Sequence, residues 1–213
     1  MRMNYDQNDD CWYKLGIIGG TFDPIHFGHL ISAETVREKL KLEQIIFIPA
    51  GKPPHKTDKK ITDSQHRYNM VVKAVEDNPF FAVSDLEIKR EGFSYTVDTI
   101  SYFKSILPQD TELFFIVGSD AILELHTWKE PERLLTLCQF VVMTRPGYQN
   151  NELFSLVDKY NQNKFVKGIK IVEVPYIEIS STLIRNRVKN GLSITYLVPE
   201  KVEKYIREHG LYL

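Results

Sequence analysis

The chain has 213 residues, of which 43% are hydrophobic and 26% are charged, and its formal net charge at pH 7 is −1. This composition is ordinary for a globular protein, and the near-neutral charge gives no overall field that would attract nucleic acid or a membrane surface. No apolar run approaches the ~18 residues of a membrane-spanning helix. Residues 1–13 are polar and acidic, so we expect a loosely ordered N-terminal extension rather than a signal peptide.

Short apolar runs alternate along the chain with stretches of helical periodicity. The runs are continuous, which is typical of strands covered on both faces of a parallel sheet. The predicted strands are 14–18, 44–49, 80–84, 112–117, 139–144 and 169–174, and the predicted helices are 28–42, 64–78, 95–107 and 199–210. The last helix has Pro199 at its first position and Gly210 just past its end. This alternation predicts an α/β fold, a doubly wound and mostly parallel sheet with helices on both faces.

The remaining segments predict one domain over residues 14–213. Residues 51–63 are too polar for a core and hold two adjacent prolines, which predicts a long loop after the second strand. Residues 147–168 predict a polar insertion with one helix. Cys11 and Cys138 lie far apart and form no CxxC pattern, so a disulfide framework is not expected and a reducing cytoplasm fits best.

The stretch GIIGGTFDPIHFGH, at 16–29, is the first that carries chemistry. Gly19 and Gly20 end the first predicted strand; glycine permits positive φ and has no Cβ, so a phosphate can approach the backbone. The next helix offers unpaired N–H groups and the positive end of its dipole. His26 and His29, three residues apart around the helix start, can turn both rings to the same side and donate to phosphate oxygens. The stretch therefore predicts an anion site.

Two other interpretations of the histidine pair are open: ligation of a metal ion, and ordinary surface exposure. A metal site would need further ligands, and no cysteine or other histidine lies nearby in sequence. It would also leave the glycines unexplained. The stretch is not a Walker loop, because no GK[ST] follows, and it is not GxGxxG.

A second stretch, EISSTLIRNRVKNG at 178–191, has the same character. Three hydroxyl residues, Ser180, Ser181 and Thr182, are candidates for the N-cap of a helix, and a helix start rich in hydroxyls suits an anion. Arg185 follows one turn later and can reach the same anion with its guanidinium group. Taken alone, the stretch also fits a capped helix with surface arginines.

Together the two stretches resemble the nucleotidyltransferase superfamily that carries an HxGH motif. Four further blocks are similar to bacterial nicotinate-mononucleotide adenylyltransferases: IPAGKPPHK (48–56), GFSYTVDT (92–99), GSDAILELHTWKEPERLL (118–135) and TRPGY (144–148). The resemblance runs from about Lys14 to the C-terminus. It implies a Rossmann-like fold and transfer of the adenylyl group of ATP to nicotinate mononucleotide, which yields nicotinate adenine dinucleotide and pyrophosphate in NAD biosynthesis.

The resemblance also implies an ATP site. His26, His29 and Arg185 are the expected catalytic residues, with His29 nearest the α-phosphate and Arg185 on the β- and γ-phosphates. The Mg²⁺ that accompanies ATP is expected to be held mainly by phosphates and water, with no protein metal ligands. The expected ATP-binding residues are Gly19, Gly20, Thr21, Phe22, His26, His29, Ser180, Ser181, Thr182 and Arg185.

The mononucleotide site rests on the four blocks. Trp128 offers a flat apolar face to the pyridine ring, and a helix opened by Tyr95 and Thr96 offers N–H groups to the nicotinate carboxylate. A core tryptophan and simple helix capping are the alternatives. Asp120 is assigned to a ribose hydroxyl. The expected mononucleotide-binding residues are Lys52, His55, Lys56, Tyr95, Thr96, Gly118, Asp120, Trp128 and Arg145.

Two other functions stay open at this point. One is an adenylyltransferase with another phosphorylated acceptor, such as phosphopantetheine. The phosphopantetheine enzymes have Thr in place of His26 and lack the SYTVDT and Trp128 blocks. The other is a nucleotide sensor without catalysis, against which His26, His29 and Arg185 argue. The expected partners are ATP and nicotinate mononucleotide, without nucleic acid or membrane, and a homo-oligomer is left open.

Overall fold

The computed structural model describes residues 13–54 and 61–213. Of the predicted N-terminal extension, residues 1–12 lie outside the described residues. Within the described part of the chain, no helix combines the length and apolar character needed to cross a membrane.

Six strands form one parallel sheet in the order β3-β2-β1-β4-β5-β6. Each predicted strand is present to within two residues at either end. Because β2 and β3 lie to one side of β1, and β4 to the other, the order in which the chain adds strands to the sheet reverses between β1 and β4, where ligands of such sheets bind. The strands are β1 (Lys14–Gly20), β2 (Gln44–Pro49), β3 (Phe81–Val83), β4 (Glu112–Gly118), β5 (Gln139–Thr144) and β6 (Ile169–Glu173).

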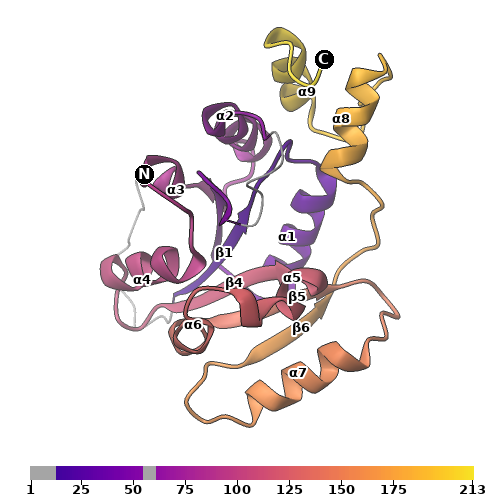
Figure 1. Cartoon of the computed structure of the whole chain (residues 1–213). Coiled ribbons are helices and arrows are strands. Elements are labelled where there is room, and N and C mark those ends of the chain that lie inside the picture. The colour runs from indigo at the N-terminus through magenta and orange to yellow at the C-terminus, as the bar shows by residue number, and fades with distance from the viewer. Residues whose placement is uncertain (1–12, 55–60) are drawn as a thin grey trace.

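Helices cover both faces of the sheet, as predicted (Figure 1). On one face lie α1 (Phe27–Leu40), α2 (Ser64–Val75), α8 (Ser181–Lys189) and α9 (Glu200–Glu208). On the other lie α4 (Thr96–Ile106), α5 (Ser119–Leu123), α6 (Pro131–Leu137) and α7 (Asn151–Asn161), the last within the predicted polar insertion.

The two apolar cores follow from the two-residue period of the strands. In β2, Ile45 and Phe47 pack against α1 and α2, whereas Ile46 and Ile48 pack in the core that includes α4. All four side chains are fully buried. A strand with apolar residues on both faces has a continuous apolar run in the sequence. These runs are why the sequence located the strands so closely.

The sequence analysis missed several short helices. These are α3 (Leu86–Lys89), α5, the 3₁₀ helix η2 (Leu125–Thr127) and α6. Each spans seven residues or fewer, too few for a helical period to show. The expected position of Pro199 was also wrong, because it is the N-cap of α9 rather than its first residue. Gly210 lies just past the C-cap, as predicted.

Candidate active site

His26 and His29 form a stacked pair at the start of α1, beyond the carboxyl end of β1. Their ring centroids are 3.7 Å apart and the ring planes are inclined by 25°. His26 is the N-cap of α1 and is buried, and its Nδ1 has no hydrogen-bond partner among residues 13–54 and 61–213. The backbone N–H of His26 donates to Nδ1 of His29 at 3.3 Å. Since Nδ1 of His29 accepts, the proton of the neutral ring is on Nε2, which can donate to an anion.

Burial keeps both rings uncharged in the absence of ligand. It lowers the pKa of His26 from 6.5 to about 4. The pKa of His29 is lowered well below its ordinary value, first by burial and second by the charge that His26 would carry. An incoming phosphate would oppose both effects, because an anion favours the protonated imidazole.

The turn before these histidines depends on Gly20 and Phe22. A Cβ on Gly20 would lie 2.9 Å from the ring of Phe22, so the close approach requires glycine. Neither Gly19 nor Gly20 has the positive φ that their flexibility would allow; Phe22 has it instead, with φ of 49°. The Phe22 ring is buried against His29, edge to face, with the ring centroids 5.2 Å apart. Phe22 therefore supports the histidine from the core.

The second predicted motif meets this turn in space, although the two are about 160 residues apart. Arg185, on α8, donates from Nη1 to the carbonyl of Asp23 at 2.7 Å. Its Nη2 also donates to the hydroxyl of Thr182 at 3.2 Å. Ser181 donates to the carbonyl of Pro24 at 2.8 Å. The predicted convergence of the two motifs is present in the structure.

The three hydroxyl groups at the start of α8 make different contacts. Ser180 is the N-cap, and its Oγ accepts from the N–H of Leu183 at 3.1 Å, as predicted. The hydroxyls of Ser181 and Thr182 both contact protein groups. Their contacts orient the helix start and Arg185, so the backbone N–H groups of the first turn and the guanidinium are the groups best suited to an anion.

Arg67, on α2, is a site residue that the sequence analysis missed. Its side chain is 1% exposed and donates to the carbonyls of Thr21, Ala50, Gly51 and Thr62, at distances between 2.6 and 3.2 Å. These contacts fasten the loop after β1 to the loop after β2. A signal was available, because Arg67 stands on the buried face of α2 beside Met70 and Val71.

A cavity of about 310 Å³ extends from the β1 turn toward the mononucleotide residues. It meets a neighbouring cavity of about 470 Å³ at Ser94, Thr96 and Trp128, among other residues lining both. The predicted residues that line the first cavity come from β1 and its turn, α4, β4 and the residue after η2: Gly19, Gly20, Thr21, Thr96, Gly118 and Trp128. Tyr95 lines the second. Space for a heterocycle therefore adjoins the phosphate motifs.

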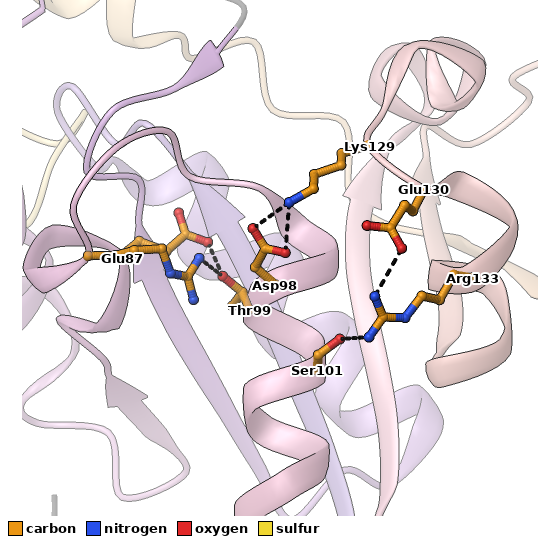
Figure 2. A network of polar contacts seen from close by, with 8 residues as sticks. Glu87, Asp98, Thr99, Ser101, Lys129, Glu130 and Arg133 are labelled. Atoms are coloured by element: carbon orange, nitrogen blue, oxygen red, sulfur yellow. Dashed lines mark hydrogen bonds and ion pairs between the residues drawn. The ribbon is translucent and has the colours of Figure 1, made fainter.

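Trp128 forms one wall of both cavities. It is half-buried, and its ring packs against Phe115 and Phe140, with centroids 6.0 and 6.3 Å apart. The next residue, Lys129, donates to both carboxylate oxygens of Asp98 on α4 at 3.1 Å (Figure 2). This ion pair joins the tryptophan segment to the start of α4, whose N-cap, Tyr95, makes no side-chain capping bond. Tyr95 therefore occupies the N-cap position without capping the helix through its side chain.

A buried carboxylate, Glu87, organises the other wall. The hydroxyl of Thr99 donates to it at 2.7 Å, and burial raises its pKa (Figure 2). Ser94 hydrogen-bonds the same carboxylate with its side chain, and its Oγ accepts the N–H of Gly51 at 3.0 Å. A Cβ on Gly51 would lie 2.1 Å from the carbonyl of Glu87, so only glycine allows this packing. The sequence analysis assigned no role to Glu87.

Several predicted residues lie outside the cavity linings. Lys52 is exposed; its Nζ lies 4.9 Å from the centre of the Phe93 ring. Arg145 follows β5 and stacks on Tyr176 at 4.7 Å. Asp120 is exposed in the first turn of α5. All three lie near the carboxyl edge of the sheet, so their assignment to the mononucleotide stays a prediction. The predicted His55 and Lys56 lie outside the described residues.

Comparison with known proteins identifies the family. The family described as cytidylyltransferase-like matches residues 17–187. A "Probable nicotinate-nucleotide adenylyltransferase" of a Thermoanaerobacter species is 52% identical over 199 residues, which cover 93% of this chain and 94% of that protein. The chain belongs to the nicotinate-nucleotide adenylyltransferase family. A second member with the same name, from Moorella thermoacetica, is 50% identical over 93% of this chain and 91% of its own length.

A solved structure shares the adenylyltransferase fold. It is described as Plasmodium falciparum nicotinic acid mononucleotide adenylyltransferase complexed with NaAD. The TM-score is 0.76 at 22% identity, and the match covers 94% of this chain and 97% of that one. The predicted Rossmann-like nucleotidyltransferase fold is therefore confirmed.

Proposed function

We propose that this adenylyltransferase joins the adenylyl group of ATP to nicotinate mononucleotide. A phosphate oxygen of the mononucleotide attacks the α-phosphorus, the bond from that phosphorus to the bridging oxygen of the β-phosphate breaks, and pyrophosphate leaves. Nicotinate adenine dinucleotide is the other product. The observation that carries the proposal is the convergence of the two phosphate motifs, through Arg185 and Asp23, beside a cavity that Trp128 lines.

The residues fit a reaction that needs positioning and charge stabilisation. The attacking phosphate is anionic at neutral pH, so no general base is required. The main difficulty is to bring two anions together and to stabilise charge on the α-phosphate and the leaving pyrophosphate. In the proposal, Nε2–H of His29 donates at the α-phosphate, and Arg185 neutralises the β- and γ-phosphates. His26 supports His29 through the stack of the two rings.

The cavity supports the position that we propose for the acceptor. Trp128 offers a flat face to the pyridine ring, and the first-turn N–H groups of α4 receive the carboxylate. The family membership supports nicotinate as the acceptor, since the relatives at about half identity carry that name. A carboxylate at a helix N-terminus also fits the acid better than the amide.

Mg²⁺ bound to ATP is part of the proposal. The groups around the phosphate motifs are hydrogen-bond donors, and the nearby carboxylate, Asp23, already accepts from Tyr212 and from the N–H of Thr62. This donor set suits phosphate oxygens, so the ion would be held by phosphates and water. When bound, Mg²⁺ supplies positive charge to the polyphosphate; the protein residues orient the nucleotide.

A pyrophosphate-release assay with ATP and Mg²⁺ tests the proposal. Nicotinate mononucleotide, nicotinamide mononucleotide and phosphopantetheine are compared as acceptors. We expect the highest kcat/KM with nicotinate mononucleotide. A higher value with phosphopantetheine, or no release with any acceptor, would overturn the assignment.

A further inference from the structure

The C-terminal segment that follows α9 returns to the phosphate site. After α9 ends, the N–H of Leu211 donates to the carbonyl of Ile206 at 3.0 Å, which folds the segment back on the helix. The hydroxyl of Tyr212 then donates to Oδ1 of Asp23 at 2.8 Å. The two residues are 189 positions apart in the chain. Tyr212 thus contacts the GGTFDP turn.

Asp23 is the point where the segments of the phosphate site meet. Its side chain is 6% exposed, and Oδ2 accepts the N–H of Thr62 at 3.3 Å, so the loop before α2 holds the second oxygen. Its backbone carbonyl accepts Nη1 of Arg185 at 2.7 Å. The carbonyl that positions Arg185 and the carboxylate that accepts Tyr212 therefore belong to one residue. A shift of this residue moves the arginine.

The backbone conformation of Tyr212 indicates that its contacts are specific. Its φ is 68°, in the left-handed region that favours glycine, and surrounding contacts must offset the strain of a tyrosine there. Burial, followed by the charge of Asp23, raises the pKa of its phenol, so the hydroxyl keeps its proton and can donate at neutral pH.

We propose that Tyr212 is a positioning residue for adenylyl transfer. It fixes the carboxylate of Asp23, and through that residue the orientation of Arg185 and the turn that leads to His26. It does not touch substrate. This inference rests on the proposed function, and it assigns the C-terminal segment to the ATP side of the site, away from the cavity lined by Trp128.

Tyr212→Phe tests the proposal, because it removes one hydroxyl and keeps the ring. We expect kcat to fall and the KM for ATP to rise, so that kcat/KM for ATP falls about tenfold, as expected for a small displacement of a phosphate-binding group. The KM for nicotinate mononucleotide should stay within about twofold of wild type, because that site lies on β4 and α4. A loss of folded protein would lower kcat without changing either KM.

The matched control is Tyr196→Phe. Tyr196 also has a positive φ, 67°, but it is 87% exposed. The substitution Tyr196→Phe should therefore leave both KM values and kcat unchanged. In an Asp23→Ala background, adding Tyr212→Phe should have no further effect, because the contact is already absent. If Tyr212→Phe does not fold, Asp23→Asn carries the test and should raise the KM for ATP.

The outcomes separate this inference from the proposed function. If wild type releases pyrophosphate and Tyr212→Phe matches it in kcat and in the KM for ATP, the positioning role is wrong and the function stands. If wild type is inactive with every acceptor but Tyr212→Phe binds ATP about tenfold more weakly by calorimetry, the positioning role stands and the function is wrong. Equal changes in the KM for both substrates would also overturn the positioning role.

Discussion

Nδ1 of His29 accepts the backbone N–H of His26 at 3.3 Å, and this one contact decides which nitrogen of the neutral His29 ring carries the proton. A neutral imidazole that accepts at Nδ1 carries its proton on Nε2. The ring stacks on His26 and makes an edge-to-face contact with Phe22. The proton is thus in place before ATP arrives, which is the arrangement expected of a preorganised transition-state donor.

His29→Ala should lower kcat by about 10²–10³, the usual cost of losing one preorganised donor to a transition state. ATP affinity should fall much less, because the donor acts mainly on charge that develops during transfer. Pyrophosphate release under saturating substrates measures the first quantity and calorimetric titration the second. Near-normal turnover of a folded variant would contradict the role.

The buried histidines should also make stability depend on pH. With a pKa of about 4 in the folded protein, against 6.5 when unfolded, His26 binds a proton in the unfolded chain before it does so in the folded one. The contribution of His26 to the free energy of unfolding is therefore complete above about pH 6.5 and is lost as the pH falls toward 4. At pH 5, this one residue has lowered the free energy of unfolding by about 2 kcal/mol.

Urea unfolding at a series of pH values between 4 and 7 measures this dependence. His26→Gln should flatten the decline over that window relative to wild type, since glutamine does not titrate. Parallel curves for the two proteins would show that the depressed pKa of His26 does not contribute.

Trp128→Ala should raise the KM for nicotinate mononucleotide at least about fivefold and leave the KM for ATP unchanged, because an aromatic stack contributes about 1 kcal/mol beyond burial. Trp128→Phe should recover part of the loss. Phe165→Ala is the control, since Phe165 is 87% exposed and lies outside both cavities. A rise in the KM for ATP instead would contradict the assignment of Trp128 to the mononucleotide.

Arg67→Met should destabilise the fold by about 3–5 kcal/mol, because it leaves four carbonyls without their donor in a buried position. The comparison is Arg133→Met, which breaks an exposed ion pair with Glu130 and should cost less than about 1 kcal/mol (Figure 2). Chemical denaturation of both variants gives the two free energies. A loss for Arg67→Met as small as for Arg133→Met would mean that water replaces the guanidinium.

The sequence predicted the strands and the two phosphate motifs of the site because the signals for them are local in the sequence. Strands covered on both faces are continuous apolar runs, and the GGTFDPIHFGH and ISSTLIR stretches mark the two phosphate motifs by their hydroxyls, glycines and cations. The all-parallel topology then brings the ends of β1 and β4 to one edge, where Gly20 and Gly118 line the same cavity. Periodicity and motif order were sufficient for this much.

The residues that join the loops were not predictable in the same way. Arg67, Glu87 and Tyr212 act through partners between 5 and 189 positions distant, and no spacing rule states which loop will meet a given side chain. The sequence does contain a signal for Arg67, a charged residue on an apolar helix face, whereas it contains none for Tyr212. Asp23 stood inside the quoted motif, yet its contacts come from chain segments whose proximity only the fold creates.

The direction of the strands has a practical consequence for labelling. Both cavities open at the carboxyl ends of the strands, whereas the turn that leads into β4, at Pro108–Asp110, is exposed at the opposite edge. A fluorophore or an affinity handle inserted at 108–110 would report on or immobilise the enzyme without obstructing nucleotide entry. A tag fused behind Leu213 would instead begin one residue from a group that touches the GGTFDP turn.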